Sequence, residues 1–156
     1  MKGGIGMPYI INEKTLALFP NGKKTKVMEW NKEFLLEESI TKMLEYNCNL
    51  NGSTFEGRRR GSSYLIGSSY KPPIIMDEIK SLILIPTHSS KNPLCKWFIL
   101  ENIQKYFLNR HNRLTIIFKN NQKIELDICF ANFDKQVLRA IRLGSSLRGR
   151  KSKKYL

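Results

Sequence analysis

The sequence predicts an α+β domain that is mostly antiparallel β-sheet with two helices and no helix-turn-helix. Short runs rich in β-branched and aromatic residues recur along the chain, and turn residues separate them. Only two segments, residues 40–50 and 133–143, carry the apolar spacing of a helix. More than 80 residues separate these two segments, a distance that excludes a helix-turn-helix made from them.

The first part of the chain predicts strands followed by one helix. Four strands are expected at residues 9–11, 15–19, 26–30 and 33–36. The first two flank Asn12-Glu13-Lys14 and are expected to form a hairpin. Ser39 is a suitable N-cap for a helix over 40–50, and Asn51-Gly52 ends that helix.

The stretch from residue 52 to residue 73 has the composition of a loop. It contains four glycines, five serines and the run Arg58-Arg59-Arg60, and we expect one short strand in it at 64–66. Pro72-Pro73 then fixes an extended approach to the next strand. Further strands are expected at residues 74–76, 82–85, 97–100, 113–118 and 123–128.

The last predicted helix, 133–143 with Asn132 as its N-cap, has two unlike sides. Its apolar side is expected to face the core and consists of Phe133, Val137, Ala140 and Ile141. The opposite side is expected to be a basic stripe formed by Lys135, Arg139 and Arg142. Because the remaining chain is basic without any acidic residue, we predict one domain over 1–145 and a flexible basic tail over 146–156.

The composition favours a polyanionic partner. The chain has 27 Lys and Arg against 13 Asp and Glu, a net charge of +14, which suits DNA, RNA or an anionic membrane surface. No apolar run approaches the roughly 20 residues that span a bilayer, and residues 1–6 lack the apolar stretch of a signal peptide. We therefore expect a cytoplasmic protein that does not insert into a membrane.

Signatures of catalysis, metal binding and cofactor binding are weak. The three cysteines are widely spaced without a CxxC pair, and neither a phosphate-binding loop nor GxGxxG is present. Glu125 and Asp127 share a strand face, but Lys123 lies on the same face, which indicates the solvent side. Nothing orients Cys95 and His111 as a nucleophile and base. We expect no enzyme activity, no metal and no cofactor.

The basic residues are the stronger signal. The three consecutive arginines lie among small hydroxyl residues and glycines, which can approach a nucleic-acid backbone closely. Arginine also fits the narrow, electronegative minor groove of A-tracts. The aromatic octamer of an RNA-recognition sheet is absent. These features favour a loop-and-sheet protein that reads the DNA minor groove. An RNA- or ribosome-associated basic protein, or an enzyme acting on nucleic acid, remain the alternatives.

Several short motifs resemble the competence transcription factor family, ComK. They include residues 52–58, the KPPI run at 71–74, and the pattern PTxSSxxPxCxW at 86–97. Phe133-Asp134-Lys135-Gln136-Val137 with Arg139 is similar to the family's last shared segment. The blocks keep the family's order and spacing over roughly residues 9–145.

The resemblance implies a bacterial activator of DNA-uptake genes that binds AT-boxes in the minor groove and bends the DNA. It implies AT-rich double-stranded DNA, RNA polymerase and further copies of the chain, as dimer and tetramer, as partners. The expected location is the nucleoid. Longer relatives continue into a tail that recruits an adaptor–protease system, and this route of control is doubtful for a chain that stops at Tyr155-Leu156.

The expected DNA-binding residues come from two sources. The resemblance implies Ser53, Thr54, Arg58, Lys71, Thr87, Ser89, Ser90 and Arg139. We add Arg59, Arg60 and Arg142 because of their own charge and their position beside these residues.

Overall fold

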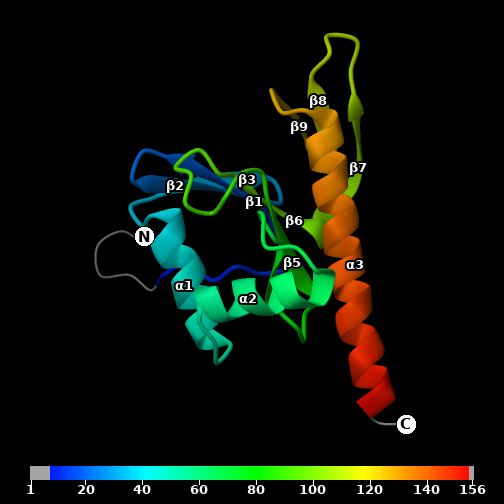
Figure 1. The fold of residues 1–156 in the computed structure, drawn as a ribbon. Coiled ribbons are helices and arrows are strands. Elements are labelled where there is room, and N and C mark those ends of the chain that lie inside the picture. Colours follow the sequence, from blue (N-terminus) through cyan, green and yellow to red (C-terminus); the bar gives the residue numbers. More distant parts are fainter. Residues whose placement is uncertain (1–7, 155–156) are drawn as a thin grey trace.

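A computed structural model describes residues 8–154 of the chain, and the side chains of residues 8–150. Within this part the fold is α+β with two antiparallel sheets, which confirms the predicted class (Figure 1). The strands are β1 (Thr15–Asn21), β2 (Lys24–Glu29), β3 (Lys32–Leu36), β4 (Ile74–Asp77), β5 (Leu82–Pro86), β6 (Trp97–Ile99), β7 (Ile103–Leu108), β8 (Leu114–Phe118) and β9 (Lys123–Leu126). The helices are α1 (Ile40–Leu50), α2 (Phe55–Ile66) and α3 (Phe130–Lys154).

The larger sheet has six strands in the order β3-β2-β1-β6-β5-β4. The predicted strand at 9–11 is wrong, because this segment bonds to α1 instead of to a neighbouring strand. Asn47 of α1 accepts a hydrogen bond from the Ile11 N–H at 2.9 Å and donates to the Tyr9 carbonyl at 3.0 Å. The hairpin that does form joins β1 to β2, and Gly22 supplies the positive φ of 63° at its turn.

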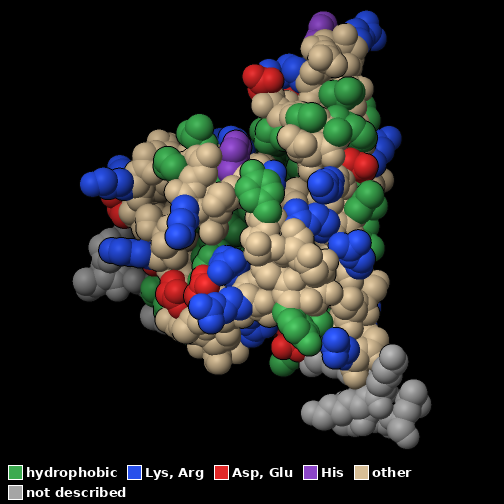
Figure 2. All heavy atoms as spheres, viewed as in Figure 1, with side chains coloured by type: hydrophobic (Ala, Val, Ile, Leu, Met, Phe, Trp, Pro, Cys, Tyr) green, Lys and Arg blue, Asp and Glu red, His purple; other side chains and the backbone are tan. Residues whose placement is uncertain are grey.

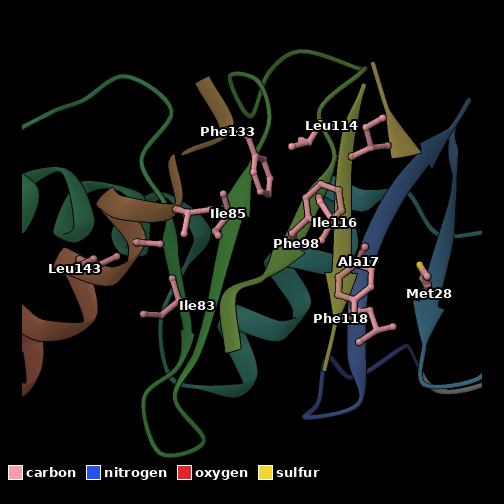
Figure 3. Close-up of a cluster of buried hydrophobic side chains, with 14 of the residues drawn as sticks. Ala17, Met28, Ile83, Ile85, Phe98, Leu114, Ile116, Phe118, Phe133 and Leu143 are labelled. Carbon is pink, nitrogen blue, oxygen red and sulfur yellow. The ribbon is translucent and has the colours of Figure 1, made fainter. Parts of the chain in front are cut away.

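The central strands β1, β6 and β5 are buried on both faces of the six-stranded sheet, and alternate residues face opposite clusters. Leu18 and Trp97 pack with α1 on one side, whereas Ala17 and Phe98 pack with α3 and β8 on the other. In Figure 3, Phe98 and Phe118 point into the same space between the two sheets. The sheet therefore separates α1 from α3, and the three-stranded sheet β7-β8-β9 lies on the α3 side.

Helix α2 occupies the stretch that the sequence predicted to be a loop with a strand at 64–66, so that prediction is wrong. Thr54 caps the helix, since its hydroxyl accepts from the Gly57 N–H at 3.0 Å. Gly67, with a φ of 72°, ends it in the left-handed conformation. The glycines and serines inside the helix are tolerated because Ser62 and Ile66 are buried against the rest of the molecule. Tertiary burial outweighs the poor helix propensity of glycine here.

Helix α3 begins earlier and ends later than the predicted 133–143. Asn132 lies inside it and is not its N-cap. Phe133, Val137 and Ala140 face the core as predicted, but Ile141 is 48% exposed. The helix continues to Lys154 and so includes most of the predicted tail. Residues 155–156 of that tail lie outside the described part of the chain. Residues 1–6, for which the sequence predicts no signal peptide, lie outside it as well. The division at residue 145 stays a prediction.

Strand β7 had no counterpart in the prediction. Its sequence, IQKYFL, does not alternate apolar and polar residues as a half-buried strand does. In the structure Gln104, Lys105, Phe107 and Leu108 are all exposed. It pairs with β8, and the two strands form a hairpin that extends away from α1 and α2 (Figure 1).

Candidate nucleic-acid interface

Two adjoining hollows of about 470 and 310 Å³ lie beside the first turns of α2. We call them together the α2 groove. Both hollows are lined by Phe55, Glu56, Arg59, Ser90, Lys91 and Trp97. The groove thus brings the start of α2 together with the loop after β5, two segments that the sequence predicted to bind DNA. Figure 2 shows basic and acidic side chains side by side over the start of α2.

Arg59 and Arg60 share one carboxylate at this groove. Arg59 donates to both oxygens of Glu56, at 2.9 and 2.6 Å, and Arg60 donates to one of them at 3.1 Å. The hydrogen bond from Arg59, reinforced by Arg60, lowers the pKa of Glu56 to about 2. The carboxylate therefore stays charged at neutral pH and lies between two guanidinium groups.

Arg58 lies on a different side of α2 and does not line the groove. Its side chain is only 15% exposed and lies 3.6 Å from Glu78. It also donates to the Asn51 carbonyl at 3.3 Å. The three consecutive arginines consequently do not form one surface, because a helix turns neighbouring residues by about 100°.

The loop residues predicted to bind DNA divide into exposed and buried groups. Ser89 and Ser90 line the groove, whereas Thr87 is buried and accepts from the Lys96 N–H at 2.9 Å. Lys71 lines the groove, and its ammonium group donates to the Thr87 carbonyl at 3.4 Å. Burial, followed by the nearby Arg139 guanidinium, lowers the pKa of Lys71.

Two residues of α3 hold both groove loops, and we call Gln136 and Arg139 the α3 clamp. Gln136 donates to the carbonyls of Lys71 and Pro86 at 2.9 and 3.0 Å. Arg139 donates to Gln136 at 2.6 Å and to the Tyr70 carbonyl at 2.7 Å. These contacts fix the residue-71 loop and the start of the residue-87 loop to one helix.

Arg139 is therefore not on an exposed basic stripe, and this part of the prediction is wrong. Only 8% of the residue is exposed, because residues 68–71 cover the side of α3 that the helical spacing placed opposite the core. Lys135 and Arg142 are exposed, as predicted. Arg142 donates to the carbonyl of Ile66 at the end of α2, at 3.3 Å.

Of the remaining predicted residues, Ser53 and Thr54 lie at the N-terminus of α2 and outside the set that lines the groove. Sequence reasoning missed several polar groove residues, namely Lys23, Lys24, Ser69 and Lys91. Lys91 directly follows the predicted Ser89-Ser90 pair, and its charge could have indicated it. Lys23 and Lys24 come from the β1–β2 turn, a segment far away in sequence, which no local pattern connects to α2.

The groups that could have indicated catalysis have other partners. Glu125 lies 3.6 Å from Arg113, and both side chains are about half exposed. Cys95 is buried, and burial raises the pKa of its thiol, which opposes formation of a nucleophilic thiolate. Within residues 8–154 no group of three or more His, Cys, Asp or Glu side chains is placed to hold a metal ion. None of the described helices combines the length and apolar character needed to cross a membrane.

Comparison with known proteins shows the family of this chain. The family model of the ComK protein matches residues 7–152. A competence transcription factor of Bacillus subtilis (strain 168) is 28% identical over 146 residues, which cover 91% of this chain and 76% of that relative. No solved structure matches the chain.

Proposed function

Because the chain belongs to the ComK family, we propose that it is a competence transcription regulator that binds AT-rich double-stranded DNA through the α2 groove. It acts as an activator at the nucleoid in the cytoplasm, without catalysis. It bends AT-box promoter DNA, assembles on it as a dimer and tetramer, and assists RNA polymerase. The observation that carries the DNA contact is the pair Arg59 and Arg60, whose guanidinium groups already hold an anion at the groove.

The charge of the groove supports an anionic partner. The groove is lined by the cations Lys23, Lys24, Arg59, Lys71 and Lys91 and by the acids Glu45 and Glu56. Arg59 of the groove and the neighbouring Arg60 are already engaged with Glu56, so a phosphate can replace an existing anion without new ordering of the arginines. The net charge of +14 adds salt-dependent attraction to any duplex.

The minor groove is the surface of DNA that these side chains suit. Arginine inserted into a narrow A-tract groove gains from its enhanced negative potential. Small hydroxyls such as Ser89 and Ser90 approach the sugar–phosphate walls closely. The sequence excluded a helix-turn-helix because its two predicted helices were distant, but α1 and α2 are consecutive and only residues 51–54 separate them. The contacts proposed come from the first turns of α2 and the loop after β5, so readout of the major groove is not part of the proposal.

The placement of each side chain refines the expected contacts. The groove residues that can reach DNA directly are Arg59, Lys71, Ser89 and Ser90, with Lys91 added. Arg60 lies outside the lining of the groove but is exposed and bonded to Glu56 at its edge. Thr87 and Arg139 act by holding the loops in place. Ser53, Thr54, Arg58 and Arg142 lie at the margins of α2 and contribute less.

Fluorescence anisotropy on three matched duplexes tests this function. One duplex carries paired A/T runs, the second replaces them by I·C pairs, and the third by G·C pairs. I·C keeps the minor-groove face of A·T and changes the major groove. We expect tight binding to the first two and weak binding to the third. Equal binding to all three contradicts minor-groove readout, and tighter binding to structured RNA favours the ribosome-associated alternative.

The same measurement on Arg59→Ala tests the α2 groove itself. We expect a loss of about 1–3 kcal/mol on the A/T duplex. Lys14→Ala is the matched control, since Lys14 is an exposed cation before β1 and is not among the residues that line the groove. Equal losses for the two variants would show that only total charge matters and would overturn the groove as the binding site.

A further inference from the structure

The β7–β8 hairpin is a projecting element with a basic tip. Figure 1 shows the two strands extending beyond the other elements, and Figure 2 shows a histidine and Lys or Arg side chains at the end. Residues 109–113 form the turn and contain Arg110, His111 and Arg113 without an acidic residue. Arg110 and His111 are exposed. The turn therefore presents positive charge far from the α2 groove.

The conformation of this tip is held by its own hydrogen bonds. The side-chain oxygen of Asn109 accepts from the N–H groups of His111 and Arg113, at 2.9 and 3.1 Å. The backbone N–H of Asn109 donates to the Arg113 carbonyl at 2.9 Å. Asn112 supplies the positive φ of 61° that the turn needs. The basic side chains are thus presented by an ordered backbone.

The base of the hairpin is fixed to α3. Tyr106 donates to Asp134 at 2.6 Å, and its ring packs against Phe133 and Phe130, with ring centres 5.3 and 5.7 Å apart. Because the α3 clamp also holds the groove loops, one helix connects the hairpin and the α2 groove. The hairpin and the α2 groove are therefore held in a fixed orientation to each other by α3.

Exposed apolar side chains directly precede the basic turn. Phe107 and Leu108 are 39% and 46% exposed at the end of β7. Side chains of this kind pack against sugars or partly unstacked bases when an arm enters a DNA groove. The strands of the hairpin belong to the sheet β7-β8-β9, so the element offered to the DNA is the turn at 109–113 with the residues beside it.

From these observations we propose that the β7–β8 hairpin is a second DNA-contacting element, an arm that extends the binding site along the duplex. Arg110 contacts a phosphate, and Phe107 and Leu108 lie against the sugars beside it. Arg113 lies 3.6 Å from Glu125 of β9 and is not assigned a contact. This inference rests on the proposed function, because the arm is assigned to the same duplex that occupies the α2 groove. It assigns DNA contacts to a strand and a turn outside that groove.

Salt titrations on duplexes of decreasing length test the arm. On a long A/T duplex, Arg110→Ala is expected to lower affinity about three- to tenfold and to reduce the slope of log K against log salt by about 0.9. On a duplex shortened to the groove site alone, wild type and Arg110→Ala are expected to bind equally. Arg110→Lys is expected to keep the wild-type slope, because it keeps the charge.

The control is Lys80→Ala, which removes an exposed cation from the β4–β5 turn. Unchanged slope and length dependence in Arg110→Ala, together with a loss in Arg59→Ala, would overturn the arm and leave the α2 groove standing. A loss in neither variant would overturn the proposed function itself. An unfolding midpoint of Arg110→Ala equal to that of the wild type establishes that the variant remains folded.

Discussion

The arginines of α2 and the arginine of α3 differ in what they hold. Arg59 and Arg60 hold the exposed carboxylate of Glu56 at the edge of a groove. Arg139 is buried and holds the Tyr70 carbonyl, Ser68 and the Gln136 side chain. Both sites satisfy arginine donors, but in the proposed function only the first exchanges its acceptor for a phosphate. Backbone carbonyls cannot leave without moving the loops that contain them.

This difference shows that accessibility decides the role of an arginine in a basic protein. An exposed ion pair contributes little to stability, because solvent screens it, so its arginines are available to a partner at small cost. A buried guanidinium that donates several hydrogen bonds is costly to remove, because its acceptors lose their donor. Substitution of Arg59 or Arg60 should therefore change DNA affinity, whereas substitution of Arg139 should change the free energy of unfolding.

The largest effect is expected for Arg139→Ala. The substitution removes donors from Gln136, Ser68 and the Tyr70 carbonyl, and we expect a loss of about 2–3 kcal/mol in the free energy of unfolding. Urea denaturation followed by circular dichroism measures this loss. Arg142→Ala is the matched control, since it removes an exposed arginine one turn further along α3.

Two outcomes would contradict this assignment of Arg139. Unfolding free energies that are equal for Arg139→Ala and Arg142→Ala would show that the α3 clamp does not stabilise the fold. Wild-type stability combined with a selective loss of A/T discrimination would show that Arg139 reads DNA directly, as the sequence suggested.

A smaller effect on stability is expected for Thr54→Ala at the start of α2. The hydroxyl of Thr54 accepts from the Gly57 N–H, and loss of such a cap costs about 1 kcal/mol. Arg59 and Arg60 lie in the turns that follow, so DNA affinity should fall modestly with stability. Thr54→Ser keeps the cap and serves as the control. Full stability in Thr54→Ala would show that packing alone fixes the start of α2.

The sequence predicted the fold class because most elements have local signals. Ser39 caps α1 as predicted, and its side chain accepts from the Lys42 N–H at 3.2 Å. Strands with β-branched runs, such as β5 and β8, lie close to their expected positions. The failures occur where distant segments decide the structure. α2 is rich in glycine and serine and is helical because the tertiary structure buries Ile66, and β7 has no alternation to detect.

The candidate site was predicted by residue type and corrected by position. Charge made Arg59 and Arg60 candidates, and they stay a prediction, whereas helical spacing alone could not show that residues 68–71 cover Arg139. Lys23 and Lys24 reach the groove from another hairpin, which sequence proximity does not reveal. A single sequence therefore indicates which residues are suited to bind an anion, and the fold decides which of them are accessible.

The smallest effect, and the sharpest comparison of the two arginine sites, is expected for Glu56→Gln. Removing the carboxylate frees Arg59 and Arg60, so affinity for every duplex should rise about two- to fivefold, with a slightly steeper salt dependence. Discrimination between A/T and G·C duplexes should stay unchanged, because both carry the same phosphates and gain equally from the freed arginines. Anisotropy on the matched duplexes measures both quantities.

The pH dependence separates this effect from protonation of Glu56. The pKa of Glu56 is lowered to about 2, so the ion pair is complete above the ordinary pKa of a glutamate and is lost only as pH falls toward 2. Wild-type binding between pH 7 and pH 5 should therefore show no rise from release of the arginines, and Glu56→Gln should keep its advantage at both values. Weaker binding by Glu56→Gln with unchanged stability would show that the carboxylate positions the two arginines for DNA and does not compete with it.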